Sequence, residues 1–459
     1  MSDNASSNSS PASASRPANY PWGSLLLLLL IAAFVRGGMF WLMPDGLSRD
    51  PDAYRDIAQC LATWGEFGYA TNVVTDPYPI AFRPPLYPLL LSNYVSDGEL
   101  SIWRVGLLHW LLGLATVFLT YHTARLWQLP QLAFGAGLLV ACDPILLKAS
   151  TEVMTETLAT FLAILGLYAL ARFHTARTPF NSALVGGALA LAELCRPVFL
   201  VWLVLAAVAM PLQRTTWPRR LANLAAYGLT VVVIVAPWAI RNERLFGAPI
   251  ITTTHGGHTF LLGNSDNFYE YLRQEKRFWP YAADALYAEQ HDLDVRFALY
   301  RGSADGLEET LQSGDEVARG RGSYKIARSR ISQEPGMFAC ACLYRLRRLW
   351  GLWPYPTEEP EPRTKFWLRQ ATAAWYGAEW IAALVGAWTL GRRLFQSPWL
   401  FGTLLVIAVT GVHTFYWTDL RMRAPLMPFV ALVAAVGAER LWSRFRKRAA
   451  HAARLRRAQ

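Results

Sequence analysis

The sequence predicts an all-α protein that crosses a membrane many times, with about ten to eleven transmembrane helices. Of its 459 residues, 53% are hydrophobic and only 17% are charged, whereas about 25% are charged in a typical soluble domain. Several uninterrupted apolar runs reach or approach the roughly 20 residues that a spanning helix needs. Composition and run length together therefore indicate a polytopic helical membrane protein.

The apolar runs define ten expected spans, with boundaries uncertain by about two to four residues. In chain order they are 23–43, 103–124, 130–147, 155–172, 181–195, 197–212, 220–239, 368–390, 398–416 and 424–442. The fifth and sixth spans share one apolar stretch, which Glu193, Arg196 and Pro197 interrupt.

With a cytoplasmic N-terminus, the basic residues outside the spans gather on the cytoplasmic side, as the positive-inside rule predicts. The short inner loops contain Arg125, Arg172, Arg177, Arg214, Arg219, Arg220, Arg392 and Arg393. We therefore expect a multi-pass protein of the cytoplasmic (inner) membrane with both termini in the cytoplasm. A basic tail on anionic lipid headgroups explains the net charge of +11. No nucleic acid is expected as a partner, because the tail lacks a groove-reading module.

The spans divide the chain into five parts. These are a disordered cytoplasmic N-terminus (1–22), an N-terminal transmembrane catalytic module (23–240) that includes an outer loop (44–102), an extracytoplasmic helical domain (241–367), C-terminal transmembrane helices (368–442) and a basic cytoplasmic tail (443–459). The N-terminus is rich in Ser, Asn, Ala and Pro, a composition typical of disorder. The segment 241–367 is too long to be a mere connector, so we expect it to form a small helical domain over the membrane.

The outer loop contains a short stretch with the pattern of an amphipathic helix. Residues 52–64 place apolar side chains at helical spacing, at Ala53, Ile57, Leu61 and Trp64. This pattern predicts a helix that lies at the membrane interface and begins near Asp50 and Asp52.

Asp50 and Asp52 admit two roles at the start of that helix. An Asp before a helix acts as an N-cap and stabilises it by about 1 kcal/mol. A carboxylate that instead faces a cavity can act as a general base, provided that an acceptor hydroxyl lies within hydrogen-bond reach. We expect one of the two aspartates to be the helix cap and the other to be the base, but the spacing alone does not show which is which.

Arg83 precedes Pro84 and Pro85, which exclude a helix there and hold the backbone extended. An arginine at a membrane surface can simply extend its charge to the headgroups. Alternatively, its guanidinium binds a phosphate through paired N–H donors. The proline-stiffened turn favours the second interpretation, a shaped anion site.

More ionisable residues lie at the outer ends of the spans, where charges are costly and often functional. They are Lys148, Glu152, Glu156, Glu193, Arg196, Arg421 and Arg423. By the expected topology they converge on one face of the membrane. The simpler alternative is a set of structural ion pairs, of which Glu193 with Arg196 is the most obvious.

His255-Gly256-Gly257-His258 resembles a metal-binding pair, but a glycine-rich loop does not preorient ligands and no third ligand follows nearby. A glycine-rich turn near the substrate cavity is the preferred interpretation. No metal is assigned, although a divalent cation is compatible with the sequence. No cofactor is required either, because the chain has no Walker or Rossmann glycine pattern.

Several short motifs, taken in order, resemble the GT-C superfamily of polyprenyl-phosphate-dependent membrane glycosyltransferases. The resemblance is to the bacterial branch that contains protein O-mannosyltransferases and the lipid A aminoarabinose transferase. The matching segments are Asp50-Pro51-Asp52-Ala53-Tyr54, Arg83-Pro84-Pro85-Leu86-Tyr87-Pro88, Thr155-Glu156-Thr157-Leu158, Cys195-Arg196-Pro197, Ala236-Pro237-Trp238-Ala239-Ile240-Arg241-Asn242, the turn from Gly256-Gly257 to Gly263-Asn264, and Arg421-Met422-Arg423-Ala424-Pro425. They are spread over nearly the whole chain. The resemblance implies a GT-C type bundle with an amphipathic first outer loop and a small helical extracytoplasmic domain.

The resemblance also implies roles for the acidic residues. In that family an acidic residue of the first outer loop is the catalytic acid/base, and its usual place four residues before an aromatic maps onto Asp50 and Tyr54. Relatives often have Glu where this chain has Pro51, which leaves open whether Asp52 shares or takes over the role. The acidic residue between the third and fourth spans maps onto Glu156, with Glu152 as a rival.

The basic residues follow in the same way. The residue that contacts the carrier phosphate maps onto Arg83, and the mouth of the final span maps onto Arg421 and Arg423. Arg196 is expected to support the site. The resemblance thus implies an inverting glycosyltransferase that moves a hexose or pentose from a polyprenyl-phosphate (or diphosphate) carrier to an envelope acceptor, whether lipid, glycan or protein, on the outer face of the membrane.

Two alternatives remain at the level of the sequence. A transporter or flippase of lipid-linked sugars shares the polytopic helices, although transporters usually bind substrate near the bilayer midplane on broken helices. A non-catalytic relative that scaffolds envelope assembly is the other.

Overall fold

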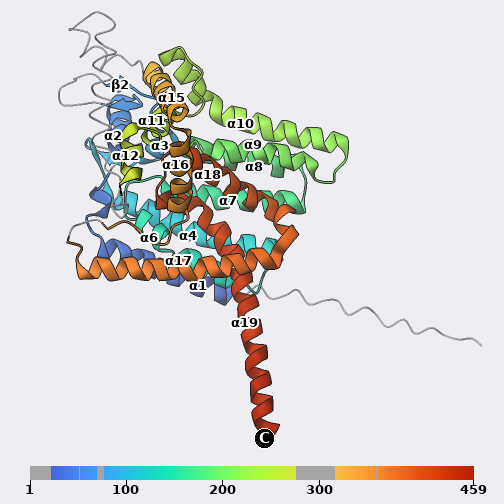
Figure 1. Cartoon of the computed structure of the whole chain (residues 1–459). Coiled ribbons are helices and arrows are strands. Elements are labelled where there is room, and N and C mark those ends of the chain that lie inside the picture. The colour runs from blue at the N-terminus through green and yellow to red at the C-terminus, as the bar shows by residue number, and fades with distance from the viewer. Residues whose placement is uncertain (1–21, 51, 70–76, 275–315, 357–359, 459) are drawn as a thin grey trace, which may run out of the picture.

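The computed structural model describes residues 22–50, 52–69, 77–274, 316–356 and 360–458. The chain is mostly helical, as the sequence predicts (Figure 1). The N-terminus that we expect to be disordered lies, apart from Trp22, outside the described residues. Short two-stranded ladders are the only strands within the described part.

The N-terminal half consists of α-helices and short 3₁₀ helices (η). They are α1 (Trp22–Leu42), η1 (Gly46–Ser48), α2 (Tyr54–Trp64), α3 (Leu86–Ser92), α4 (Ile102–Leu126), α5 (Ala133–Cys142), α6 (Pro144–Ala149), α7 (Glu156–Thr175), α8 (Pro179–Cys195), α9 (Phe199–Ala209), η2 (Met210–Leu212) and α10 (Trp217–Phe246). The helix predicted in the loop 44–102 is present as α2, and its place at the membrane interface stays a prediction. It is followed by the antiparallel ladders β1 (Gly68–Tyr69) with β2 (Tyr78–Pro79) and β3 (Val95–Ser96) with β4 (Glu99–Leu100).

The C-terminal half is also helical within the described residues. Its elements are α11 (His255–Leu262), α12 (Asp266–Arg273), α15 (Glu316–Gln333), α16 (Pro335–Leu349), α17 (Arg363–Leu390), η3 (Gly391–Phe395), α18 (Trp399–Phe415), η4 (Leu420–Leu426) and α19 (Met427–Ala458).

Helix α7 is the centre of the bundle. Fourteen of its residues are buried, and it packs against α4, α8 and η4. Figure 1 shows α7, α8, α9 and α10 running side by side, with α2, α3 and α11 gathered at one end of them. The core thus holds α7 rigidly, and its first residue, Glu156, lies at the end where the outer loop folds over.

The predicted span 130–147 is wrong as a single helix. Asp143 has an extended backbone between α5 and α6, and its carboxylate caps α6 by accepting a hydrogen bond from Leu146 N at 2.9 Å. Pro144 follows at the first position of α6, where its missing N–H costs nothing. The Tyr376 hydroxyl of α17 donates to the same carboxylate at 3.0 Å. An Asp-Pro pair therefore ends one helix and starts the next.

The other nine expected spans each coincide with a helix, but not all of these helices are long. Among the described residues, five helices are long and apolar enough to cross a membrane, or six if α17 and α18, bent by 105°, count as one span. α5, α8 and α9 are apolar but shorter. The total of ten to eleven spans stays a prediction, and so does a separate extracytoplasmic domain.

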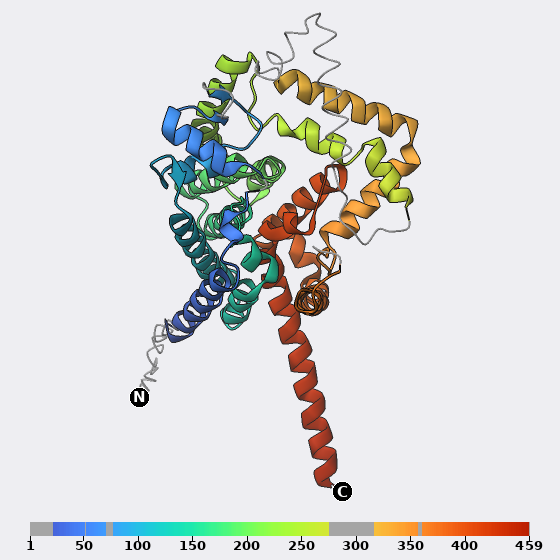
Figure 2. The same ribbon diagram turned by 90° about the vertical axis from the view of Figure 1, so that its left-hand side faces the viewer.

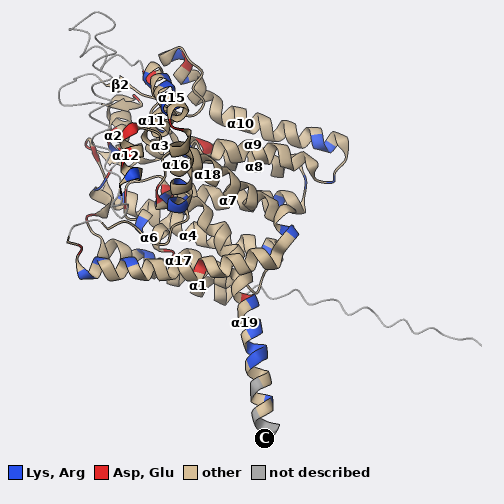
Figure 3. Ribbon diagram, viewed as in Figure 1, with Lys and Arg blue, Asp and Glu red and all other residues tan. Residues whose placement is uncertain are grey.

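Helix α19 begins inside the bundle and ends far outside it. Its first residues are buried, whereas from Glu439 onward the described side chains are mostly exposed. Figures 1 and 2 show this part projecting away from the body, on the side opposite to α15. Figure 3 shows Lys and Arg along the projection and at the start of α10, where Arg219 and Arg220 lie. A cytoplasmic location for these charges stays a prediction.

Candidate active site

The start of α2 gives Asp50 and Asp52 different surroundings. The Asp50 carboxylate accepts hydrogen bonds from Tyr54 N at 3.0 Å and Arg55 N at 2.6 Å, so both of its oxygens cap α2. Ala53 has a φ of 57°, in the left-handed region that costs a non-glycine residue about 1 kcal/mol. This turn separates Asp52 from the capping position. Asp50 is therefore the helix cap, and Asp52 is free to make other contacts.

Asp52 lies between two arginines from distant parts of the chain. Its Oδ1 is 3.2 Å from Arg83 Nη2, and its Oδ2 is 3.5 Å from Arg421 Nη2. The Asp52 side chain is 20% exposed, so a second molecule can reach it. One carboxylate thus holds together the proline-stiffened turn after β2 and the start of η4.

Arg83 is shielded by aromatic rings but remains a cation. Its guanidinium carbon lies 5.6 Å from the centroid of the Tyr54 ring and 5.3 Å from that of Phe82. Burial by itself would lower the pKa of Arg83, but the nearby Tyr54 and Asp52 raise it, and the net pKa is above the ordinary value. A buried, permanently charged guanidinium with an unused Nε–H is well suited to an anion.

Glu156 continues the chain of charges. Its Oε1 is 3.2 Å from Arg196 Nη1 and 3.7 Å from Arg421 Nε. Its side chain is only 2% exposed, and its Oε2 has no hydrogen-bond partner. Arg421 therefore bridges two carboxylates. The described residues form one alternating row of ion pairs, in the order Arg83, Asp52, Arg421, Glu156 and Arg196.

Three predicted site residues lie away from this row. Asp50 caps α2, as described above. Glu152 pairs with Lys148 at 3.8 Å, one turn apart on the segment before α7. Arg423 is fully buried and donates to the carbonyl oxygens of Leu349 (3.0 Å) and Gly351.

The surroundings of Arg423 explain why it cannot act beside Arg421. Its guanidinium carbon lies 4.1 Å from the Tyr376 ring centroid and 4.9 Å from that of Trp380. Both rings belong to α17, so Arg423 anchors η4 to α17 and α16. The two arginines of the motif leave η4 in different directions because they are only two residues apart.

The alternative of a Glu193–Arg196 ion pair is wrong. Arg196 pairs with Glu156 instead. Both carboxylate oxygens of Glu193 are buried and have no hydrogen-bond partner in the described part of the chain. Backbone geometry causes this result, because Arg196 follows the last residue of α8 with an extended conformation and its side chain turns toward α7.

Sequence reasoning missed a hydrogen-bonded pair beneath the row. Tyr87 of α3 shares a hydrogen bond of 2.8 Å with His109 Nε2, and His109 Nδ1 lies 3.0 Å from the carbonyl oxygen of Ser150. The Tyr87 ring meets the Tyr54 ring edge to face at 5.3 Å. A histidine in the apolar middle of α4 was the available signal.

The His255-Gly256-Gly257-His258 motif is not a turn but the first part of α11. Both histidine rings pack on Phe82, with centroids 4.2 and 5.9 Å away. Across the described residues, no group of three or more His, Cys, Asp or Glu side chains is arranged to hold a metal ion. The motif therefore acts in packing next to Arg83.

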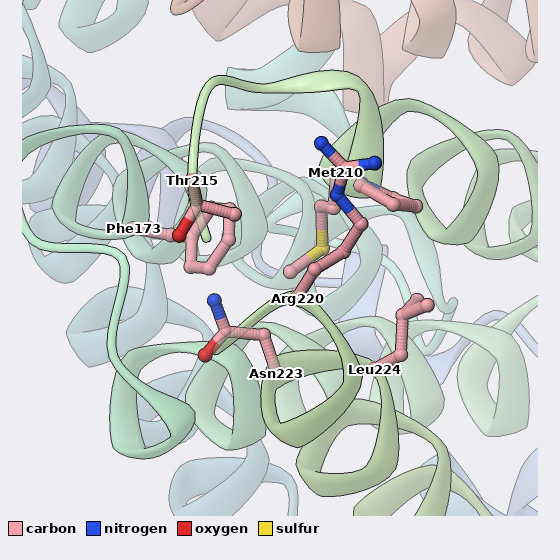
Figure 4. A pocket seen from close by; sticks show the side chains of 7 residues that line it. Phe173, Met210, Thr215, Arg220, Asn223 and Leu224 are labelled. Carbon is pink, nitrogen blue, oxygen red and sulfur yellow. The ribbon is translucent and has the colours of Figure 1, made fainter. Parts of the chain in front are cut away.

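A small pocket elsewhere in the bundle does not coincide with the row of charges. It is lined by Phe173, Met210, Pro211, Thr215, Arg220, Asn223 and Leu224 (Figure 4). Phe173 is near the C-terminal end of α7, whereas Glu156 is its first residue, and 17 residues of helix separate them by about 25 Å. The row of charges is consequently the candidate active site.

Part of the sequence matches the model of a known protein family. Residues 83–240, about a third of the chain, match the family model described as dolichyl-phosphate-mannose-protein mannosyltransferase. No curated protein matches the sequence.

Solved structures share the fold at low sequence identity. The apo oligosaccharyltransferase from Archaeoglobus fulgidus matches with a TM-score of 0.50 and 15% identity, over 94% of this chain and 52% of that one. The same enzyme tethered to an acceptor peptide gives a TM-score of 0.50 and 13% identity, over 93% and 50% of the two chains. ArnT from Cupriavidus metallidurans bound to undecaprenyl phosphate matches with a TM-score of 0.39 and 16% identity, over 92% and 79%. The chain spans about half the length of the oligosaccharyltransferase.

The family model covers the segment from the Arg83 turn to α10, and the oligosaccharyltransferase supplies the fold around it. Both matches agree with the resemblance that the motifs predicted, the first over residues 83–240 and the second in fold.

Proposed function

We propose that this protein is an inverting glycosyltransferase that moves a sugar from a polyprenyl-phosphate carrier to an acceptor in the cell envelope, on the outer face of the cytoplasmic membrane. The observation that carries the proposal is the Asp52 carboxylate held between Arg83 and Arg421. This arrangement combines a base with two phosphate-binding cations, which are the groups that such a transfer needs.

In the free protein Arg83 and Arg421 pair with Asp52, and the phosphate of a donor can replace Asp52 as their partner. A phosphate monoester or diester presents oxygens that paired guanidinium N–H groups bind strongly. When the donor phosphate takes up Arg83 and Arg421, the Asp52 carboxylate is released from both ion pairs. Donor binding would thus free Asp52 for the acceptor at the moment when it is required.

The chemical step is a single displacement. Asp52 takes the proton of the acceptor hydroxyl or amine while the acceptor atom forms a bond to the anomeric carbon. The bond from that carbon to the phosphate oxygen breaks, and its electron pair leaves with the polyprenyl phosphate. Arg83 and Arg421 stabilise the charge that develops on this oxygen. Attack from the side opposite the leaving group inverts the anomeric configuration.

Asp52 is a better base than its two acidic neighbours for geometric reasons. Both oxygens of Asp50 accept N–H groups of α2. Glu156 is almost fully buried, at 2% side-chain exposure, whereas Asp52 is 20% exposed. We therefore assign Glu156 and Arg196 to holding Arg421 in place and assign Asp50 to the start of α2.

A transfer assay tests the proposal. Purified protein in lipid nanodiscs is incubated with a panel of undecaprenyl-phosphate sugars and with envelope lipid, glycan and protein fractions as acceptors. Release of undecaprenyl phosphate and labelling of an acceptor are expected for the wild type. Arg83→Ala and Asp52→Asn are expected to lower the rate at least about a hundredfold.

Each outcome of this assay has a defined meaning. Wild-type rates in both variants would refute the site. Movement of the lipid-linked sugar across the membrane without release of undecaprenyl phosphate would instead identify a flippase. Lys325→Ala, on the outer helix α15, is a matched control for the loss of a cation away from the site.

A further inference from the structure

The backbone just before Arg83 is held both by its own loop, where Ile80 N donates to Phe67 O at 3.1 Å, and by residues far along the chain. Ala81 is fully buried. Its N–H donates to Glu316 Oε2 at 2.9 Å, and its carbonyl oxygen accepts from Thr254 N at 3.0 Å. Both partners come from residues more than 150 positions away, at the starts of α15 and α11. Arg83 follows two positions after Ala81, with only Phe82 between them.

Glu316 joins the two helices to the loop. Its second oxygen, Oε1, accepts a short hydrogen bond from the Thr254 hydroxyl. The whole residue is only 6% exposed. A carboxylate in such a place is costly unless its oxygens are hydrogen-bonded, and here each oxygen has a donor. Glu316 therefore belongs to a specific contact and not to a solvated helix start.

A glycine allows the close approach of the helices that carry Thr254 and Glu316. A Cβ atom at Gly257 would collide with the carbonyl oxygen of Gly320, which is backbone and cannot turn aside. One at Gly256 would meet only the Tyr324 hydroxyl, the movable end of a side chain. Gly257 is therefore the position at which α11 and α15 need glycine to approach so closely.

The other side of the same backbone is held from α10. Arg241 donates to the carbonyl oxygens of Ile80 at 2.9 Å and Phe67 at 2.7 Å, and its Nη2 is also 2.9 Å from Glu66 Oε1. Ile80 and Ala81 are consequently fixed from two sides. Among the described residues, the charged groups that fix them are Arg241 of α10 and Glu316 of α15.

We propose that Glu316 is a positioning residue of the active site, which sets the Arg83 turn for the carrier phosphate through its hydrogen bond to Ala81. The inference rests on the proposed function, because it assigns the phosphate of the donor to Arg83. It also gives α15 a role in donor binding, because Arg83 is placed correctly only when α15 contacts the first outer loop.

Direct binding of a lipid phosphate tests this role. Affinities are measured by native mass spectrometry in nanodiscs, with undecaprenyl phosphate as the probe and undecaprenol as the phosphate-free reference. Glu316→Ala is expected to weaken undecaprenyl-phosphate binding about tenfold, the effect of losing one hydrogen bond to a charged group. Glu316→Gln, whose amide oxygen still accepts from Ala81, is expected to lose less. Binding of undecaprenol is expected to stay unchanged in both.

Two controls separate positioning from a general loss of structure. Glu334→Ala removes a partly exposed carboxylate just beyond the other end of α15, which pairs with Arg273, and is expected to bind like the wild type. In an Arg83→Ala background, Glu316→Ala is expected to cause no further loss, since it acts through Arg83. Should Glu316→Ala not fold, Thr254→Val removes the other partner of the carboxylate and is expected to weaken binding severalfold.

The outcomes distinguish this inference from the proposed function. If the wild type binds undecaprenyl phosphate no better than undecaprenol, the proposed function fails. If it discriminates between them but Glu316→Ala does so equally well, only the positioning role fails. An equal loss with and without Arg83 would also overturn the positioning role, because Glu316 would then act independently of that arginine.

Discussion

At the scale of single residues, the partners of the carboxylate oxygens decide which role an aspartate can have. Asp50 and Asp52 are two positions apart and have the same chemistry. The two N–H donors of α2 occupy Asp50, whereas two arginines that a phosphate can compete for occupy Asp52. Backbone donors cannot leave when a substrate arrives, but side-chain cations can. The exchangeable partners favour Asp52 as the base.

Substitution of Asp52 is expected to lower the transfer rate, and substitution of Asp50 is expected to lower stability. Asp52→Asn should lower the transfer rate by about a hundredfold or more, the usual contribution of a general base, with little change in melting temperature. Asp50→Ala should destabilise the start of α2 by about 1 kcal/mol and leave most of the transfer rate. Rates and thermal melting in detergent check both. Asp50→Asn retains a capping side chain, so a complete loss of transfer in that variant would assign the base to Asp50 instead.

The sequence could predict which residues lie in or near this site, but not which role each of them has. Arg83 is marked by the prolines that follow it, and Glu156, Arg196 and Arg421 are marked as charges at the ends of apolar runs. The left-handed backbone of Ala53, which turns Asp52 away from the cap, leaves no trace in the pattern of residues. Likewise, Arg421 and Arg423 look equivalent in sequence, and only the path of η4 between α16, α17 and the site separates them.

At the scale of elements, η4 is the piece whose position decides where Arg421 lies. Asp419 caps η4 by accepting from Leu420 N at 2.6 Å, and it also pairs with Arg348 of α16 at 2.6 Å. On the other side, Arg423 is anchored between α16 and α17. The outer helix α16 therefore supports Arg421 at one end of the row, as Glu316 of α15 supports Arg83 at the other.

The Arg348–Asp419 contact predicts a dependence of stability on pH. Burial raises the pKa of Asp419, but Arg348 and the Leu420 N–H outweigh this effect, and the net pKa lies below the ordinary value of 3.8. Because the folded-state pKa is depressed, the contact stabilises fully above pH 3.8, and this stabilisation is lost as the pH falls through the folded-state value.

Melting temperatures measured against pH check this expectation. The difference between the wild type and Arg348→Gln should be constant from neutral pH to about pH 5 and should shrink in stronger acid. Arg347→Gln, an exposed neighbour on α16, should differ little from the wild type at any pH. A difference that grows toward acid would contradict the assignment.

Close packing of α17 on α19 is the second expectation at this scale. A Cβ atom at Gly386 would collide with the carbonyl oxygen of Val433, whereas one at Gly377 of the same helix would meet nothing within 4 Å. Gly386→Leu should therefore lower the melting temperature, since overpacking costs about 1–3 kcal/mol, and Gly377→Leu should not. Equal melting temperatures of the two variants would show that the helices can separate at little cost.

Hydropathy predicts these helices well because burial in lipid requires long apolar runs, but it does not predict their breaks. The expected span 130–147 failed at Asp143-Pro144, where a single polar residue caps a new helix and is held by Tyr376 from α17. Such a contact joins residues more than 200 positions apart and depends on the assembled bundle. The same holds for the clamp of Glu316 on Ala81, which no local pattern indicates.

At the scale of the whole molecule, the proposed chemistry requires that the row of charges and the outer segment lie on one side of the membrane and the projecting part of α19 on the other. The fold agrees in one respect: α15 and the projection of α19 lie at opposite ends of the molecule (Figure 2). Arg219 and Arg220 belong to the first turn of α10, and Figure 1 shows α11 beside the other end of that helix. A sugar carrier that is presented outside the cytoplasm could reach Asp52 only in this orientation.

A native cysteine makes the orientation measurable. Cys340, on α16, is exposed, whereas Cys60 and Cys195 are buried. In spheroplasts, a membrane-impermeant maleimide should label the wild type, and Cys340→Ser should lose most of that label. Ser443→Cys, introduced into the Cys340→Ser background on the projecting part of α19, should react only after the membrane is permeabilised. The reverse pattern would put Asp52 and Arg83 in the cytoplasm, where transfer to an envelope acceptor on the outer face could not occur.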